Sequence, residues 1–258
     1  MTERPAALVT GGARRIGEAI VRRFAAEGWH VAIHCHTSGD AAEALASELP
    51  SAETVACDLS DVKAAVAMVE RIAAQLSDWR VLVNCASVFR PDEATALDPA
   101  IFEEAMRVNA ETPAAMAQAF LRLARSSAGR RVVDVTDQKL ANPNADFFSY
   151  TVSKHALAAT VPMMAMAADS ADRIYALAPG AILASHDQSP EESELSHRMN
   201  LLGRRTGADE VADTAWFLAT GPLASGQTLF VDSGQHLLSQ PRDVMFLARG
   251  DTTREERG

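Results

Sequence analysis

Short runs of apolar residues recur along the chain, and between them apolar residues return at the three-to-four-residue spacing of a helix face. The short runs predict buried strands at residues 6–9, 29–35, 53–59, 80–87, 130–136, 173–180 and 227–232. The intervening pattern predicts helices at residues 18–27, 39–49, 62–76, 149–168 and 209–218, with one or two helices at 101–125. Because the strands are apolar nearly throughout and alternate with helices, we expect an α/β fold whose parallel sheet of about seven strands has helices on both faces.

A glycine-rich segment, VTGGARRIG, follows the first predicted strand and opens the first helix. Gly11 and Gly17 suit a tight turn and close helix packing, with the helix N-terminus offered to a phosphate group. Two glycines at this spacing also occur by chance in ordinary loops. The position after a strand favours dinucleotide binding, and with it a doubly wound, Rossmann-type sheet whose ligands lie beyond the carboxyl ends of the strands.

Composition narrows the classes of partner. The chain of 258 residues shows no linker, repeat or low-complexity tract, so we expect one domain, residues 1–258, with its core at 6–237 and a C-terminal tail at 238–258. A formal net charge of −10 disfavours nucleic acid and anionic membranes as partners. No apolar stretch approaches membrane-spanning length, and three scattered cysteines without metal-ligand spacing predict a reduced, cytoplasmic protein with no metal site.

The end of the second strand bears on the choice of cofactor. Proteins that bind the unphosphorylated dinucleotide usually place an acid there for the ribose hydroxyls, and residues 33–38, IHCHTS, contain none. His36, Thr37 and Ser38 can instead donate hydrogen bonds to a 2′-phosphate, with Arg14 in the neighbouring loop. This pattern favours NADP(H), and two exposed histidines at a strand end are the alternative.

A tyrosine and a lysine occur four residues apart in the helical segment 149–168. Tyr150 and Lys154 therefore lie on one face of the predicted helix. A phenol has an ordinary pKa of about 10, so it needs a neighbouring cation to act as an acid–base catalyst near neutrality. The pair is common in sequences, and its value depends on the motifs around it.

Taken in order, several motifs resemble the short-chain dehydrogenase/reductase family. They span roughly residues 6–237 and are T-G-x-x-x-x-x-G, CDLSD, VNCAS, RVNAET, Y-x-x-x-K, APG and GQTLFVDSG. The resemblance implies that Tyr150 donates a proton and that Asn109 holds a water in the proton relay. It implies that Lys154 binds the nicotinamide ribose and lowers the pKa of Tyr150. It also implies a homotetramer.

The same resemblance implies which residues surround the cofactor. Asp58 would lie against the adenine, and Asn84 to Ala86 along the cofactor. The set expected to contact NADPH is Gly11, Arg14, Arg15, Ile16, Gly17, His36, Thr37, Ser38, Asp58, Leu59, Asn84, Cys85, Ala86, Ser87, Tyr150, Lys154, Pro179 and Gly180.

Two positions depart from the general family pattern. Arg15 replaces the middle glycine of the loop, and Asp137 stands thirteen residues before Tyr150, where most members have a serine that binds a carbonyl oxygen. A carboxylate would repel an oxyanion, whereas a carboxyl group beside the tyrosine can relay protons to a ring nitrogen. Asp134, three residues earlier, is a rival carboxyl group within the strand.

Both departures resemble pteridine reductases and bacterial dihydromonapterin reductases, as do the stretches IHCHTS and NCASVF. Thr37 stands at the place of a usual arginine, so more of the contact with a 2′-phosphate rests on Arg14. By that resemblance Arg15 reaches the pyrophosphate and the polar edge of a pterin. Ser87 contacts substrate and a cofactor phosphate, and Phe89 stacks on the pterin ring.

We therefore expect an NADPH-dependent reductase of a reduced-pterin C=N bond. Its expected catalytic residues are Asp137, Tyr150, Lys154 and Asn109, and its expected substrate contacts are Arg15, Ser87, Phe89, Asp137 and Tyr150. One alternative is a reductase of a ketone or 3-oxoacyl thioester, against which Asp137 argues. Another is a non-catalytic NADPH-binding protein, against which the set of Asn109, Tyr150 and Lys154 argues.

Other roles stay open for four side chains. Asp137 could cap a helix, and Phe89 could belong to the core. His186 and His197 lie in the polar stretch 184–198 and could face the substrate. We expect both histidines to be solvated residues of a surface lid.

Overall fold

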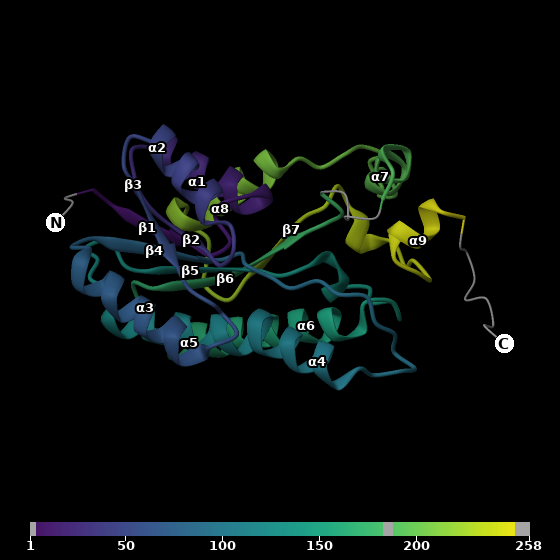
Figure 1. The fold of residues 1–258 in the computed structure, drawn as a ribbon, viewed down its shortest axis with the longest axis horizontal. Coiled ribbons are helices and arrows are strands. Elements are labelled where there is room, and N and C mark those ends of the chain that lie inside the picture. The colour runs from purple at the N-terminus through teal and green to yellow at the C-terminus, as the bar shows by residue number, and fades with distance from the viewer. Residues whose placement is uncertain (1–3, 183–187, 251–258) are drawn as a thin grey trace.

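Seven parallel strands form the middle layer of the protein in a computed structural model that describes residues 4–182 and 188–250 (Figure 1). The strands are β1 (Ala6–Val9), β2 (His30–Cys35), β3 (Ala52–Ala56), β4 (Trp79–Asn84), β5 (Arg131–Val135), β6 (Arg173–Pro179) and β7 (Thr228–Val231). Their order across the sheet is β3-β2-β1-β4-β5-β6-β7. The chain thus winds outward from β1 in one direction and from β4 in the other, and a crevice for ligands is expected where the direction reverses.

Helices cover both faces of the sheet (Figure 1). One face carries α1 (Arg15–Ala26), α2 (Gly39–Glu48) and α8 (Ala208–Thr220), and the other carries α3 (Val62–Gln75), α4 (Pro99–Met106), α5 (Thr112–Leu123) and α6 (Phe148–Ala167). Two further helices, α7 (Pro190–His197) and α9 (Val244–Ala248), pack side by side beyond the carboxyl ends of the strands. Shorter turns are η1 (Arg107–Glu111, π-helical), η2 (Gln138–Leu140) and η3 (Gln235–Leu237).

The central strands are apolar because both of their faces are covered. In β1, Ala7 and Val9 face the cluster under α1 and α8, whereas Ala6 and Leu8 face the cluster under α3 and α5. Successive side chains of a strand point to opposite faces, so every residue of a strand between two helical layers is buried. The α/β sheet of seven parallel strands in a single domain is therefore confirmed.

The predicted elements are present, but some strands end earlier than predicted. Backbone groups after them bond to side chains of other segments. The fourth strand ends at Asn84 instead of residue 87, because the N–H groups of Cys85 and Ala86 donate to Thr10 Oγ1 at 2.9 and 3.0 Å. The third strand ends at Ala56 instead of residue 59. Beyond this strand, the hydroxyl group of Thr112 donates a hydrogen bond to the carbonyl oxygen of Leu59 at 2.8 Å.

The segment 101–125 is interrupted by a π-helical turn. Helix α4 ends at Met106, η1 covers Arg107–Glu111, and α5 begins at Thr112. Such turns are frequent at functional sites, since one widened turn redirects the side chains on it. Asn109 lies in the middle of η1, fully buried.

The glycine loop is held in place by a buried histidine. Gly11 N donates to Nδ1 of His34 at 3.2 Å, so Nδ1 is unprotonated and Nε2 donates to the carbonyl of Cys57 at 3.1 Å. Burial lowers the pKa of His34 from 6.5 to about 4. A neutral imidazole thus ties the loop after β1 to the end of β3, and the alternative of two exposed histidines holds for His36 alone.

We expect this histidine to make the protein sensitive to mild acid. Since its folded pKa lies below its unfolded pKa, His34 stabilises the fold above about pH 6.5, and this stability is lost as the pH falls toward about 4. Between pH 7 and pH 5 the loss from this residue is about 2 kcal/mol in the free energy of unfolding. Urea unfolding at both pH values measures it.

The variant His34→Asn keeps an acceptor for Gly11 and removes the titration. Its loss of stability between pH 7 and pH 5 should be smaller than that of the wild type. His36→Asn, at an exposed histidine two residues away, is the matched control and should behave as the wild type. Equal pH dependence of wild type and His34→Asn would contradict the role of His34.

Candidate active site

A pocket of about 590 Å³ opens at the carboxyl edge of the sheet, where the strand order reverses. It is bounded by the glycine loop, the ends of β4, β5 and β6, the first turns of α6, and residues at α7 and α9. Of the predicted site residues, its lining contains Gly11, Arg14, Arg15, Ile16, Gly17, Cys85, Ala86, Ser87, Phe89, Asp137, Tyr150, Lys154, Pro179 and Gly180. The structure therefore brings together predicted residues from five separate segments of the chain.

The remaining predicted residues lie outside this lining: His36, Thr37, Ser38, Asp58, Leu59, Asn84 and Asn109. His36 and Asp58 are exposed and face each other, with 3.9 Å between Nε2 and Oδ2. Leu59 is buried in the core, and the side chain of Asn84 is directed into the interior, where it donates to Asp134 at 2.8 Å. A contact of these residues with the cofactor stays a prediction.

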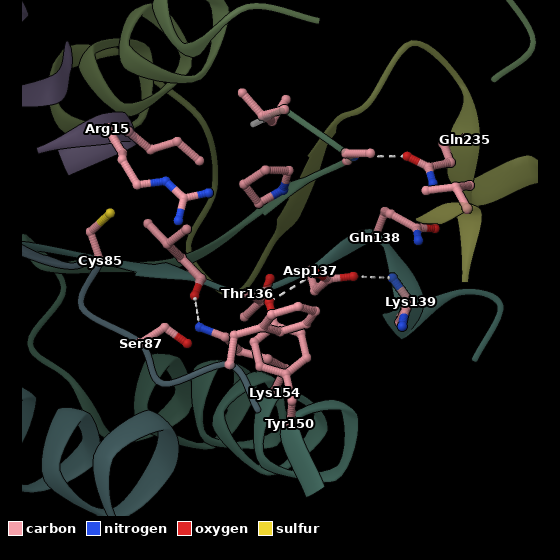
Figure 2. A pocket seen from close by; sticks show the side chains of 18 of the residues that line it. Arg15, Cys85, Ser87, Thr136, Asp137, Gln138, Lys139, Tyr150, Lys154 and Gln235 are labelled. Carbon is pink, nitrogen blue, oxygen red and sulfur yellow. Dashed lines mark hydrogen bonds between the residues drawn. The ribbon is translucent and has the colours of Figure 1, made fainter. Parts of the chain in front are cut away.

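The backbone of the glycine loop explains both its glycines and its arginine. Gly11 has φ +63°, and a Cβ on Gly17 would lie 2.2 Å from the carbonyl oxygen of Gly11. Arg15 has φ +57°, a left-handed conformation that glycine adopts easily and that costs another residue roughly 1–2 kcal/mol. The backbone therefore keeps the shape of a glycine-rich loop, while the exposed guanidinium of Arg15 reaches into the pocket (Figure 2).

The loop after β4 is fixed from two sides. Thr10 accepts the N–H groups of Cys85 and Ala86, and the buried side chain of Asn109 holds the residues that follow. Asn109 Oδ1 accepts from Val88 N at 2.8 Å, and its Nδ2 donates to Val88 O at 2.9 Å. Asn109 thus acts on the loop that carries Ser87 and Phe89, and its predicted water stays a prediction.

Asn109 also connects this loop to the helix of Tyr150. Its Nδ2 donates to Ser153 Oγ at 3.0 Å, and Ser153 donates to the carbonyl of Tyr150 at 2.7 Å. The side chain of Asn109 accordingly fixes the distance between the loop and α6. The hydrogen bonds by which Thr10 and Ser153 hold these segments are not recognisable from sequence, because Cys85, Ala86 and Asn109 lie far from them in the chain.

The two carboxyl groups near the end of β5 have different surroundings. Asp134 is buried within the sheet and bonded to Asn84, and burial raises its pKa to about 7. Asp137 lines the pocket, where its Oδ2 accepts from the hydroxyl of Tyr150 at 2.9 Å. Its Oδ1 accepts from Lys139 N at 2.8 Å (Figure 2). Asp137 therefore caps η2 with one carboxyl oxygen and accepts the hydrogen bond of Tyr150 with the other.

Burial raises the pKa of Asp137 and, together with the Asp137 carboxylate, raises the pKa of Tyr150 well above its usual value. Both shifts favour the protonated forms of this pair. The buried Nζ of Lys154 donates to the carbonyl of Val135 at 2.8 Å and lies 5.7 Å from the centre of the Tyr150 ring. The net pKa of Tyr150 lies above its usual value because burial and Asp137 dominate, and a lowering contribution from Lys154 stays a prediction.

Phe89 is a surface of the pocket and not a core residue. It is 43% exposed, and its ring stacks on Phe147 with 4.2 Å between centroids and 25° between planes. The rings of Phe89 and Tyr150 also make a T-shaped contact, with 4.7 Å between their centroids. Phe147 adopts φ +55° at the start of α6, a strained conformation that brings its ring under Phe89.

Several lining residues have no sequence motif. His197, the last residue of α7, is buried and lines the pocket. The prediction that it is a solvated residue is therefore wrong, because α7 packs against α9. His186 lies outside the described residues. The predicted tail contributes Asp243, Val244 and Met245 to the lining, a contact that only the folded chain reveals.

Within residues 4–182 and 188–250, no group of three or more histidine, cysteine or acidic side chains is arranged to hold a metal ion. In the same residues, no helix combines the length and the apolar character needed to cross a bilayer.

The sequence of this chain is similar to those of several reductases. Residues 11–236 match the family model described as enoyl-(acyl carrier protein) reductase. Ketoacyl reductase 2 of the granaticin polyketide synthase of Streptomyces violaceoruber is 32% identical over 244 residues, which cover 92% of this chain and 98% of that protein. Pteridine reductase 1 of Leishmania tarentolae is 29% identical over 279 residues, which cover 90% and 96%.

A solved structure is similar over nearly the same extent. The FolM alternative dihydrofolate reductase 1 of Brucella canis, complexed with NADP, superposes with a TM-score of 0.85 at 36% identity. The match covers 91% of this chain and 94% of that one.

The strained arginine of the glycine loop allows a test that separates shape from charge. Arg15→Gly removes the guanidinium and relieves the left-handed backbone, whereas Arg15→Ala removes the guanidinium and keeps the strain. We expect the glycine variant to be more stable than the alanine variant by about 1 kcal/mol, after the entropy that glycine adds to the unfolded chain. Thermal unfolding measures this difference.

Both variants should bind NADPH more weakly than the wild type and to a similar degree, as followed by fluorescence titration. Wild-type affinity in Arg15→Gly would show that the loop needs only its shape, and that the guanidinium has no part in binding.

Proposed function

We propose that this chain, which belongs to the short-chain dehydrogenase/reductase family, uses NADPH to reduce a C=N bond of a pterin. Membership of that family makes the protein an oxidoreductase. The pteridine reductase and the alternative dihydrofolate reductase among its relatives support a pterin or folate ring as substrate. The ketoacyl reductase relative supports a carbonyl substrate instead, so the choice between a pterin and a carbonyl is argued from the residues of the site.

The hydrogen bond between Tyr150 and Asp137 is the observation that carries the proposal. Reduction of a C=N bond needs a proton on nitrogen, and a carboxyl group that holds its own proton can replace the one that the tyrosine gives away. Reduction of a carbonyl passes through developing negative charge on oxygen, which Asp137 would destabilise in its ionised form, the form that it takes once it has given up its proton. The raised pKa of Asp137 favours the neutral acid, the form that the first reaction requires.

A bound NADPH would supply the hydride for the ring carbon, and the residues of the chain supply the proton. Tyr150 donates its hydroxyl proton to the adjacent ring nitrogen, and Asp137 transfers its carboxyl proton to the Tyr150 oxygen over 2.9 Å. Asp137 then regains a proton from solvent through the pocket that it lines.

Phe89 and Arg15 fit a flat polar ring. Phe89 exposes one part of its ring to the pocket while Phe147 supports it from behind, which makes a rigid face for stacking. Arg15 brings planar hydrogen-bond donors to the same pocket, and such donors suit the oxygen and nitrogen acceptors of a pterin edge and the oxygens of a pyrophosphate.

The glycine loop fits the dinucleotide. The absence of a side chain on Gly17 lets the first turn of α1 pack against the backbone of Gly11, and the backbone N–H groups at this helix N-terminus attract phosphate. Arg14 is exposed at the N-cap of that helix and Lys154 is at the opposite wall of the pocket, so both can hold the cofactor. The absence of an acid in residues 33–38 and the NADP complex of the Brucella relative favour NADPH over NADH.

We further propose a homotetramer in the cytoplasm, where the three free thiols stay reduced. Strand β7 is an edge of the sheet, and beside it Leu201, Leu202 and Leu237 are 56%, 65% and 63% exposed. On α6, Met163 and Met166 are 65% and 81% exposed. Two separate apolar faces, each matched to its copy, build a tetramer of dihedral symmetry.

Charge placed on either face should divide the assembly. We expect Leu237→Glu and Met166→Glu each to give dimers and the double variant to give monomers, as measured by light scattering. A monomeric wild type would contradict the tetramer.

The chemical proposal is tested by NADPH oxidation with a dihydropterin, a dihydrofolate, a ketone and a 3-oxoacyl thioester. Asp137→Asn keeps the size of the side chain and removes its acid. We expect turnover of the pterin to fall by about 10²-fold or more, as for loss of general acid catalysis. Wild-type turnover should decline as the pH rises through the raised pKa of Asp137, and this decline should be absent in Asp137→Asn.

Asp137→Ser, which restores a neutral hydroxyl, is the matched comparison and should shift the preference toward the carbonyl substrates. Identical rates and pH profiles for wild type and Asp137→Asn would reject the proton relay and favour the carbonyl reductase.

A further inference from the structure

The C-terminal segment, residues 240–250, forms one wall of the pocket. Three of its residues, Asp243, Val244 and Met245, line the cavity beside Asp137 and Tyr150. The segment is fastened to the chain after β5 by ion pairs, Lys139 to Asp243 at 2.7 Å and Arg242 to Asp146 at 2.9 Å. The ring of Phe246 also stacks on Phe147 at 5.9 Å. A region far from the glycine loop in sequence thus reaches the reacting groups.

Lys139 has an unusual position for a lysine. It is 4% exposed and lies two residues after Asp137, to whose Oδ1 its backbone N–H donates. Its Nζ contacts the Asp243 carboxylate at 2.7 Å and lies 5.0 Å from the centre of the Phe147 ring. A buried cation requires a partner, and the C-terminal segment supplies it.

We propose that Lys139 and Asp243 are positioning residues of the proton relay, a balanced pair of charges that lets Asp137 keep its proton beside Tyr150. The proposal rests on the proposed role of Asp137. A lone cation next to Asp137 would favour the carboxylate and empty the relay, and a lone anion would hold the proton too tightly. The two charges together leave Asp137 governed by its burial.

The electrostatics of the pocket agree with this role. After burial, the Lys139 cation is the largest influence on the pKa of Asp137 and lowers it, whereas the Asp243 carboxylate raises it. The other titratable or charged groups that line the pocket are Tyr150 and Lys154 on α6, Cys85 after β4, Arg14 and Arg15 at the start of α1, and His197 on α7. None of them forms an ion pair with Asp243 at the distance that Lys139 reaches. Outside the lining, Lys139 Nζ donates to the backbone oxygen of Asp146 at 3.4 Å, and its charge lowers the pKa of the Asp146 carboxyl group.

Removing either charge of the pair should shift the pKa of Asp137, and the two shifts should have opposite signs. A contact with a purely structural role would not give this result. Lys139→Met should raise the pKa of Asp137, and Asp243→Asn, which keeps a capping side chain on α9, should lower it. Each shift should be about one pH unit, as for a charge removed from the neighbourhood of a carboxyl group. The double variant should return close to the wild type.

The measurement is a ¹³C NMR titration of protein labelled at its aspartate carboxyl carbons, without substrate, with the Asp137 signal assigned by its loss in Asp137→Asn. Arg242→Met is the matched control, because it breaks the other ion pair of the same segment and should leave the Asp137 titration in place. Lys139→Gln and Asp243→Ser replace any variant that fails to fold. Shifts in the same direction, or no shift, would overturn the proposal.

The pH dependence of NADPH oxidation with a dihydropterin, measured on the same variants, separates this proposal from the function. Opposite NMR shifts with no pterin turnover would uphold the charge pair and reject the substrate. Pterin turnover with an unshifted Asp137 signal would uphold the function and reject the pair.

Discussion

Seven parallel strands end at one edge of the sheet, and at each end the ladder stops satisfying backbone N–H and C=O groups. The rest of the site depends on how side chains satisfy them. Thr10 accepts two N–H groups after β4, His34 accepts the N–H of Gly11, and Asn109 pairs with both backbone groups of Val88. These bonds hold two loops, the glycine loop and the loop after β4, in fixed positions around one pocket, since an unpaired buried group would cost about 1–3 kcal/mol. A rigid edge is therefore a condition for the chemistry that the loops carry.

Strain and unusual charge gather at the same edge. Arg15 and Phe147 both adopt positive φ angles, and both bring their side chains to the pocket. Asp137 and Tyr150 share a hydrogen bond with both pKa values raised. The positive φ angles cost the folded state energy. The apolar layers on the two faces of the sheet carry the stability that tolerates them, which is a common relation between a core and an active site.

The relatives of this chain include reductases of pterins and of carbonyls on the same fold. A fold does not select a substrate, because the groups at the pocket do so. In the function proposed for this chain, the difference rests on Asp137, thirteen residues before the tyrosine, and on the charges that surround it. Lys139 and Asp243 extend this argument, since they connect the acid to a helix that the core of the fold does not require.

The sequence by itself determined the sheet, the order of strands and helices, and most of the pocket. Apolar runs report burial on both faces of a strand, and the motifs at strand ends fall together because parallel strands end at one edge. Local spacing also placed Tyr150 and Lys154 on one helix face, and the resemblance to the short-chain dehydrogenase/reductase family added Asp137 to their site. Tertiary structure alone decided that Asp134 is bonded to Asn84, which histidine is buried, and that α7 and α9 close the pocket. Those features depend on contacts between residues up to a hundred positions apart, for which periodicity and spacing carry no signal.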